Sequence, residues 1–516
     1  MTATSDRQNL AAVGAVGAYW AAEQPDEIAI TCPSGDRSFR HLEERTNRLG
    51  RALRAAGLSA GDAVAIACTN RAEYAEVVLA CLRAGLRYTP VNWHLTAEEI
   101  AYVVVDCEAT ALVGDALIGD ALSTVAATTD RVVAYLAVGG EIEGFESYED
   151  ALAPHAPDLI EGPTLGSRML YTSGTTGRPK GVVRPPTYST GLVALTSAPD
   201  YRSGSGQRNL CTGPLYHGGP HGYGLTVPLA NGVGVVLMER WDAATALSLI
   251  ETHRITHTHM VPTMFHRLLH LPIEIREAAD VSSLRYVLHG AAPCPVDTKM
   301  AMIHWFGPII WEYFAATEGA GASCSSAEWL ARPGTVGRPP TSDHIRILDD
   351  HGDQVADGEV GEICFKRDEA VTFAYFKDPE KTASAIRTPG YASVGDIGYI
   401  DHEGWLFVTD RTAEVIVRGG VNIYPVEIEA ALLAHPAVRD AAVIGVPDEE
   451  WGESVTAAVE LEPDAEAPDL ALWCQERLAR FKRPSAIDVV ESLPRLDNGK
   501  LYRHQLREQY REGQAR

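Results

Sequence analysis

The chain has 516 residues, of which 46% are hydrophobic and 22% charged, a composition typical of soluble globular proteins. This length exceeds one ordinary hydrophobic core and predicts two to four lobes. The formal net charge is −25, from 44 Lys and Arg against 69 Asp and Glu. This sign excludes a general nucleic-acid or anionic-membrane binder, so a positive field for an anionic substrate must be local.

Cysteine usage and apolar patterning indicate a cytoplasmic protein without a membrane span. The nine cysteines are widely spaced and form no C-x-x-C pair, which favours reduced thiols over disulfides or structural zinc. The N-terminus lacks the basic and then apolar pattern of a secretory signal. The most apolar long stretch, residues 222–238, contains Thr226, Pro228 and Asn231 and is expected to form buried strand and turn.

Alternating helix and strand patterns dominate the first part of the chain. Leu42, Leu49 and Leu53 share helical spacing after Phe39, and residues 63–68 form an apolar run typical of a strand buried on both faces. A helix over 75–83 follows, ending at Ala84-Gly85. The same rhythm recurs at 131–138, 232–238, 243–253, 256–261 and 286–288. Repeated βα units predict mostly parallel sheets with helices on both faces.

The pattern of predicted secondary structure changes twice after residue 340. Residues 343–408 carry short alternating strands separated by Gly, Pro and Asp, which predicts a smaller antiparallel or barrel-like lobe. A compact region after Arg411 has its own helix, 426–434, and its own strand, 440–445. We therefore predict an α/β protein with an N-terminal domain over 1–411 and a small α+β domain over 412–516.

The sharpest local pattern is the segment 169–182, an apolar strand that leads into a Gly- and hydroxyl-rich turn and then a lysine. Glycines let backbone N–H groups face an anion, hydroxyls add donors, and lysine supplies a point charge. The segment is not a common P-loop, because no G-x-x-x-x-G-K-[ST] occurs in the chain. We expect it to hold polyphosphate through Thr172, Ser173, Gly174, Thr175, Thr176 and Lys180.

With this loop, the sequence resembles the adenylate-forming superfamily, which includes acyl-CoA synthetases, luciferases and the adenylation domains of peptide synthetases. Further segments follow in the family's order from about Phe39 to Arg503. They are Pro214-Leu-Tyr-His217, His289-Gly-Ala-Ala-Pro293, Glu312-Tyr-Phe-Ala-Ala-Thr-Glu318, Val394-Gly-Asp396, Asp410-Arg411, Gly419-Gly420 and its continuation to Glu429, Phe481-Lys-Arg-Pro484 and Gly499-Lys500.

The resemblance implies a role for each segment. His217 would line the acyl pocket, and Thr317 would donate to the α-phosphate. Glu318 would ligate Mg²⁺, which seldom needs a full protein cage when phosphates supply other ligands. Adenine would lie between the backbone of Gly290, Ala291 and Ala292 and the ring of Tyr313 or Phe314, with Asp396 and Arg411 at the ribose.

The implied C-terminal domain is mobile and carries two further groups. Lys500 matches the family lysine that bridges the substrate carboxylate and the α-phosphate, where a preorganised cation stabilises developing charge. Gly419 and Gly420 would line the path of the pantetheine arm. The chain departs from the family at Ala315, at Ala413 and at Asp497-Asn498, and the last two leave the efficiency of both half-reactions open.

The resemblance implies an acid:CoA ligase that uses ATP, Mg²⁺ and coenzyme A through an acyl adenylate. Small residues near the pocket, among them Gly218, Gly219 and Gly222, leave room for a broad pocket. Residues 312–319 resemble those of members that act on bulky polycyclic acids, with medium or long fatty acids as the runner-up and an aryl acid left open. The alternatives are an enzyme running mainly one half-reaction, such as adenylation for a carrier protein, a luciferase-like oxygenase, or a non-catalytic nucleotide-binding protein. A homodimer is left open.

Two histidines that alternate in a strand pattern, His257 and His259, resemble metal ligands at first sight. No third ligand stands at a suitable spacing, so we interpret them as a structural pair.

Overall fold

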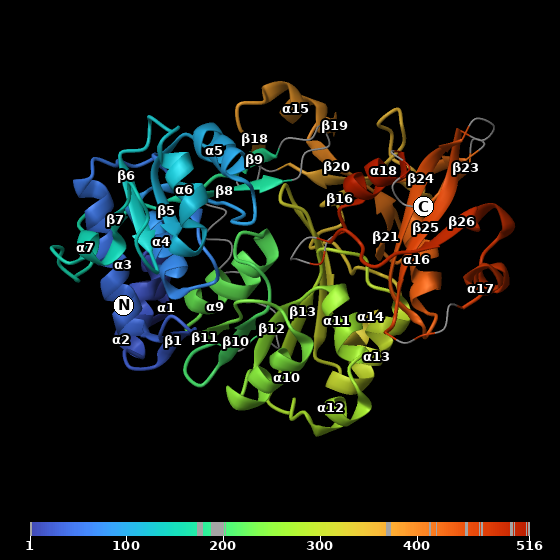
Figure 1. The fold of residues 1–516 in the computed structure, drawn as a ribbon, viewed down its shortest axis with the longest axis horizontal. Coiled ribbons are helices and arrows are strands. Elements are labelled where there is room, and N and C mark those ends of the chain that lie inside the picture. The colour runs from blue at the N-terminus through green and yellow to red at the C-terminus, as the bar shows by residue number, and fades with distance from the viewer. Residues whose placement is uncertain are drawn as a thin grey trace.

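The strands of the protein form four sheets, seen in a computed structural model (Figure 1). It describes residues 3–172, 179–186, 201, 203–367, 373–411, 414–418, 421–448, 452–463, 465, 468–495, 499, 501–511 and 513. The predicted site residues Ser173, Gly174, Thr175, Thr176, Gly419, Gly420 and Lys500 lie outside this set.

The first large sheet has the strand order β18-β9-β8-β4-β3-β5-β6-β7. Its strands from β7 to β8 are parallel, as the βα rhythm predicts, whereas β9 and β18 run antiparallel to their neighbours. The strands are β3 (Ala63–Ala67), β4 (Arg87–Pro90), β5 (Ala109–Asp115), β6 (Ala134–Val138), β7 (Glu146–Ser147), β8 (Ser167–Thr172), β9 (Lys180–Val183) and β18 (Ala374–Tyr375).

Helices of this lobe begin and end at recognisable signals. The Ser38 hydroxyl accepts a hydrogen bond from the His41 amide and caps α3 (Phe39–Ala55), and Gly85 ends α4 (Ala72–Ala84) with a φ of 76°. The other helices are α1 (Ala3–Ala12), α2 (Val16–Glu23), α5 (Ala97–Asp106), α6 (Gly119–Ala126) and α7 (Tyr148–Leu152), with a 3₁₀ turn at Ala116–Ile118.

The second large sheet has the order β15-β14-β13-β12-β10-β11-β1-β2. It contains β1 (Ile28–Thr31), β2 (Arg37–Ser38), β10 (Arg208–Cys211), β11 (Gly234–Leu237), β12 (His257–Met260), β13 (Tyr286–His289), β14 (Ile310–Ala315) and β15 (Ala320–Cys324). Only β2 and β15, at its two edges, run antiparallel to their neighbours. Its helices are α9 (Val227–Ala230), α10 (Ala243–Thr252), α11 (Pro262–Leu269), α12 (Ile273–Ala278), α13 (Val296–Phe306) and α14 (Ser326–Ala331).

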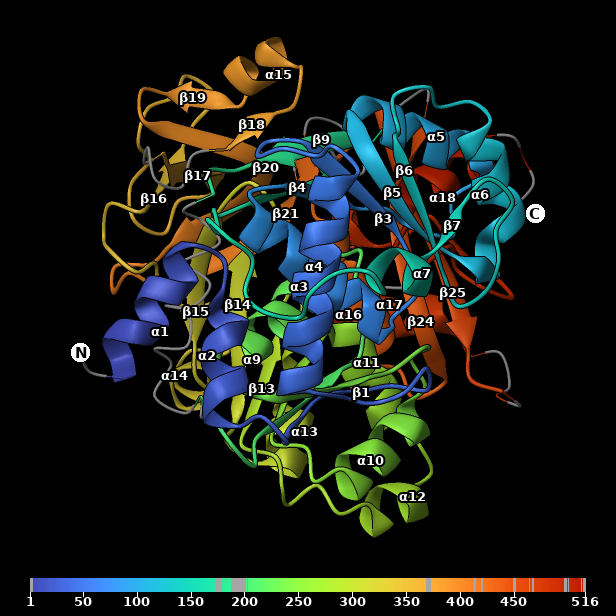
Figure 2. The same cartoon turned by 90° about the vertical axis from the view of Figure 1, so that its left-hand side faces the viewer.

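The two large sheets share one core. Helices α3 and α4 lie between them (Figure 2). A single buried cluster includes Val64 and Ile66 of the first sheet with Val235 and Leu237 of the second. The apolar run 222–238 contributes to this region, but its first half is not strand. A π-helix spans Pro220–Thr226 and continues into α9. The strand that follows, β11, takes up only four residues of the run.

The predicted small lobe is antiparallel, as its alternating strands indicate. Its strands are β16 (Ile345–Leu348), β17 (Gly361–Lys366), β19 (Ile386–Thr388), β20 (Tyr391–Ile400) and β21 (Leu406–Arg411), and α15 (Pro379–Ser384) packs beside it. Asp396 on β20 is the register partner of Arg411 on β21.

The C-terminal part forms the fourth sheet around its own core, which includes Ile416, Ile428 and Val443. Its elements are β22 (Ile416–Arg418), β23 (Val421–Ile423), α16 (Pro425–Leu433), β24 (Val438–Asp448), β25 (Gly452–Leu461), α17 (Leu470–Arg477), a 3₁₀ turn at Arg480–Lys482, β26 (Ala486–Val489) and α18 (Arg503–Arg511). The α/β class with a large first part and a small last part is confirmed, while the boundary at 412 stays a prediction. No helix in the described segments is long and apolar enough to cross a bilayer.

Candidate active site

The predicted phosphate loop joins two antiparallel strands. Thr172 closes β8 and Lys180 opens β9, and these two residues are register partners. The Lys180 Nζ atom donates to Asp378 Oδ2 at 2.6 Å. Thr172 and Lys180 therefore mark the two ends of the loop, while the glycines and hydroxyls between them lie outside the described residues.

A second lysine and a carboxylate lie close to Lys180. Asp378 caps α15 by accepting from the Lys381 amide, and the Lys180 ammonium holds the pKa of the Asp378 carboxyl below its usual range. The Lys381 Nζ atom lies 4.6 Å from the centre of the Tyr375 ring. Partial burial, and then the charge of Lys180, lowers the pKa of Lys381.

Glu318 belongs to the same group of side chains. The Tyr375 hydroxyl donates to Glu318 Oε1 at 3.0 Å. The negative charge of Glu318 raises the pKa of Lys381, opposing the effects of burial and Lys180. The Glu318 carboxylate has a second oxygen besides the one that Tyr375 contacts, and two lysines that attract phosphates lie nearby. This arrangement fits a Mg²⁺ ion whose other ligands come from a nucleotide. The carbonyl of neighbouring Thr317 accepts from Arg184 Nε at 2.8 Å, which fixes the backbone of this turn.

The segment predicted to lie under adenine is held in an unusual backbone shape. A Cβ atom at Gly290 would lie 2.5 Å from the Tyr313 carbonyl oxygen, so only glycine fits beside β14. Ala291 has a φ of 69°, in the left-handed region that residues with a Cβ rarely adopt. Such strain gathers at functional sites. Sequence reasoning found the glycine but had no signal for the strained alanine.

Tyr313 and Phe314 point to opposite faces of β14. The Phe314 ring stacks on Phe365 at 5.8 Å and belongs to a cluster that includes Val394, two residues before the buried Asp396. The Tyr313 hydroxyl instead bonds with His259 Nε2 at 3.0 Å. Phe314 therefore packs against the small lobe, whereas the Tyr313 ring lies beside Gly290 and its hydroxyl beside Gly219.

Behind these rings lies a buried ion pair that sequence reasoning missed. Lys299 on α13 is fully buried and contacts Glu312 on β14, whose Oε2 lies 3.5 Å from His289 Nε2. Burial raises the pKa of Glu312 although Lys299 opposes the rise. Burial, and then the charge of Lys299, lowers the pKa of His289 well below its usual value. The pair ties α13 to the strand that carries Tyr313 and Phe314.

The segment after His217 forms the π-helix, a rare conformation that is frequent at functional sites. The His217 ring packs against Tyr216 with centres 4.5 Å apart. A Cβ atom at Gly219 would lie 2.9 Å from His259 Cε1 and 3.1 Å from the Tyr313 hydroxyl. Side chains therefore already occupy the space beside Gly219, whereas Gly222 faces open space.

His257 and His259 are both buried side chains of β12. His257 Nδ1 bonds with the Thr256 hydroxyl at 2.7 Å, and burial lowers the pKa of His259 to about 4. A search of the described residues finds no group of three or more His, Cys, Asp and Glu side chains arranged to hold a metal ion.

Gly499, the residue before Lys500 in the chain, lies against Thr263 and Val261. Gly499 has a φ of 78°, and a Cβ atom there would lie 2.2 Å from Thr263 Oγ1 in the first turn of α11. Arg495 Nη1 donates to the Gly499 carbonyl at 2.7 Å. The residue just before Lys500 thus packs beside β12 and α11, next to the strands that carry His259 and Gly290.

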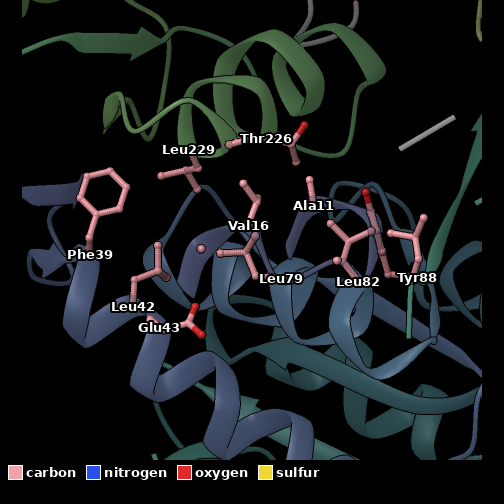
Figure 3. A pocket seen from close by; sticks show the side chains of 14 residues that line it. Ala11, Val16, Phe39, Leu42, Glu43, Leu79, Leu82, Tyr88, Thr226 and Leu229 are labelled. Atoms are coloured by element: carbon pink, nitrogen blue, oxygen red, sulfur yellow. The ribbon is translucent and has the colours of Figure 1, made fainter. Parts of the chain in front are cut away.

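An apolar cavity lies apart from these residues, between α2, α3 and α4 on one side and α9 on the other (Figure 3). Side chains such as Leu42, Leu79 and Leu229 line it, and Glu43 at its wall is paired with the fully buried Arg83. None of the predicted site residues lines it.

Comparison with known proteins identifies the family to which this arrangement belongs. The AMP-binding enzyme family matches residues 18–376, and the C-terminal domain of AMP-binding enzymes matches residues 427–500. The chain belongs to the AMP-binding enzyme family. The resemblance to adenylate-forming enzymes is thereby confirmed, and with it the prediction of an AMP-forming acid ligase.

Relatives of this AMP-binding enzyme differ in their acids and acceptors. The chain is 32% identical over 492 residues to a feruloyl-CoA synthase of an Amycolatopsis species, covering 94% of this chain and 96% of the relative. It is 30% identical to a fatty acid–acyl-carrier-protein ligase of Streptomyces coeruleorubidus, covering 95% of both. The crystal structure of ATP-bound MatB from Rhodopseudomonas palustris superposes with a TM-score of 0.85 at 29% identity, covering 97% of this chain and 99% of MatB.

Proposed function

We propose that the protein is an ATP-dependent carboxylic acid:CoA ligase that works through an acyl adenylate. The observation that carries this proposal is the grouping of Lys180, Asp378, Lys381, Tyr375 and Glu318 between the ends of β8, β9 and β14. Two cations and one metal-binding carboxylate at the end of a phosphate loop suit a magnesium nucleoside triphosphate.

In the first half-reaction, the carboxylate of the acid attacks the α-phosphorus of ATP and pyrophosphate leaves. Residues Thr172 to Lys180 bind the polyphosphate, and Thr317 orients the α-phosphate. Glu318 holds Mg²⁺, which supplies charge neutralisation to the phosphates when bound. Adenine lies over Gly290, Ala291 and Ala292 against Phe314, and Asp396 and Arg411 bind the ribose.

Lys500 stabilises the developing charge in this step, supported by the packing of Gly499 on the first turn of α11. In the second half-reaction, we propose that the part after residue 412 rotates and that Gly419 and Gly420 admit the pantetheine arm. The CoA thiolate then attacks the acyl carbonyl, forming the thioester while AMP leaves.

The experiment that tests this function incubates the protein with ATP, Mg²⁺, CoA and a panel of acids, followed by mass spectrometry of adenylate and thioester. We expect both products from at least one acid. Lys500→Ala should lose at least about 100-fold in adenylate formation, because a positioned cation is lost, yet convert a supplied acyl adenylate to thioester. Equal loss of both half-reactions contradicts the role of Lys500.

A second candidate acceptor is the thiol of a carrier protein, which the carrier-protein ligase among the relatives supports. An enzyme of this kind exchanges ATP with pyrophosphate but yields no free acyl-CoA. Adding a phosphopantetheinylated carrier protein to the same assay separates the two acceptors.

A further inference from the structure

A small cavity opens beside the predicted acyl segment, where Tyr223 of the π-helix meets His259 of β12. The empty space in and around it amounts to about 350 Å³, a figure that includes open solvent. Its lining comes from the π-helix and α9, from β10, β12 and β13, and from Tyr201. The lining residues are Tyr201, Asn209, Tyr223, Val227, Thr258, His259, Tyr286 and Leu288.

Aromatic rings make up the walls of this cavity. Tyr223 stacks on His259 with ring centres 5.6 Å apart, and Tyr201 meets Tyr286 edge to face at 5.5 Å. The Tyr223 ring also lies 4.8 Å from Tyr313, whose hydroxyl bonds with His259. Flat walls of this kind favour stacking and edge contacts with another flat ring over contacts with a flexible chain.

The described lining of the cavity mixes polar and apolar atoms without a charged side chain. It contains no Lys, Arg, Asp or Glu among the described residues, and burial keeps His259 neutral at physiological pH by lowering its pKa to about 4. A second carboxylate or an ammonium group in the ligand would lose its hydration here without gaining a partner of opposite charge. The lining therefore suits a neutral group that hydrogen-bonds.

One polar atom in the lining stands out. The Tyr201 hydroxyl oxygen is buried and has no hydrogen-bond partner in the described part of the protein. Burial raises the pKa of Tyr201, so the hydroxyl keeps its proton and acts as a donor as well as an acceptor. A buried hydroxyl without a partner is costly, and a ligand group that pairs with it removes this cost.

We propose that this cavity is the inner end of the acyl pocket and takes an aromatic carboxylic acid whose ring carries a neutral hydrogen-bonding substituent, with Tyr201 as the residue that selects it. This inference rests on the proposed ligase function. An unsubstituted ring or a fatty chain leaves the Tyr201 hydroxyl unpaired, and sites built around such a group discriminate strongly against ligands that lack the partner.

The position of Tyr313 supports this placement. Tyr313 joins the cavity through His259, while Phe314, the next residue, packs on Phe365 of the small lobe. The Tyr313 ring also lies against Gly290 of the predicted adenine segment, since a Cβ atom there would come 2.6 Å from Tyr313 Cε1. Gly219 lets the π-helix pass close to this wall, because a larger residue would collide with His259 and Tyr313.

The test compares pairs of acids that differ by one substituent: 4-hydroxybenzoic with benzoic acid and 4-hydroxycinnamic with cinnamic acid, with decanoic acid as the fatty probe. The wild-type enzyme should favour the hydroxylated member of at least one pair by about tenfold or more in kcat/KM for pyrophosphate release. Tyr201→Phe should reduce this ratio to about one by lowering kcat/KM for the hydroxylated acid.

Tyr19→Phe is the matched control, since Tyr19 packs on Trp20 away from the cavity and loses the same atom. An unchanged ratio in Tyr201→Phe, or a wild-type preference for decanoic acid, overturns the inference while leaving the ligase function intact. If no acid yields adenylate, the proposed function fails. Calorimetric binding of the same acids to wild type and Tyr201→Phe then still decides whether Tyr201 selects the substituent.

Discussion

Replacing Lys299 by methionine tests the buried ion pair between α13 and β14. Lys299 is fully buried, contacts Glu312, and has its Nζ atom 4.7 Å from the centre of the Trp329 ring. Methionine keeps most of the apolar stem but leaves the Glu312 carboxylate buried without its cation. Breaking one partner of a buried pair typically costs about 3–5 kcal/mol, and we expect Lys299→Met to fall in this range.

The measurement is urea unfolding followed by circular dichroism and by tryptophan fluorescence. Lys377→Met is the matched control, because Lys377 pairs with Glu108 at 3.2 Å while the two side chains are 45% and 37% exposed. This exposed pair should contribute no more than about 1 kcal/mol. The double variant Lys299→Met/Glu312→Leu should recover much of the loss, since no unpaired charge then remains in the core.

The pH dependence gives a second, independent readout of the same variant. Burial raises the pKa of Glu312 and Lys299 opposes the rise, so removing Lys299 raises this pKa further. A carboxyl with a raised pKa binds its proton more tightly in the folded state, so it favours folding below the unfolded pKa of about 4.3 and loses that contribution as pH rises. The deficit of Lys299→Met should therefore be smaller at pH 5 than at pH 8. A deficit that is independent of pH, or no larger than that of Lys377→Met, refutes the reasoning.

Two further predictions concern the phosphate side of the site. Asp378→Asn keeps the cap of α15 but removes the negative charge that competes with phosphates for Lys180. The KM for ATP should therefore fall several-fold. A rise in this KM would mean that Asp378 serves mainly to orient Lys180. Glu318→Gln should raise the Mg²⁺ concentration for half-maximal adenylation by about tenfold or more, whereas Tyr375→Phe, which removes only the donor to Glu318, should have a smaller effect. Equal Mg²⁺ dependence in wild type and Glu318→Gln would exclude Glu318 as the metal ligand.

Local sequence patterns predicted many of the helices and strands. The helical spacing of Leu42, Leu49 and Leu53 gave α3, and the apolar run at 63–68 gave a strand buried on both faces. The run 222–238 was the exception, because an unbroken apolar pattern does not separate a buried helix from a buried strand. There the structure places a π-helix and α9 before the short β11.

The sequence by itself determined the family and the order of its motifs, since glycines, hydroxyls and single charges at fixed spacing are local requirements of the chemistry. It did not determine the partners that lie far away in the chain. Lys180 and Asp378 are 198 residues apart, and Lys299 and Glu312 meet only because α13 packs against β14. The cavity proposed for the acid was equally hidden, because Tyr201, Tyr223 and Tyr286 come from separate parts of the chain and only their packing brings them together. Burial and pairing are properties of the folded core, and no local pattern encodes which distant side chain fills each space.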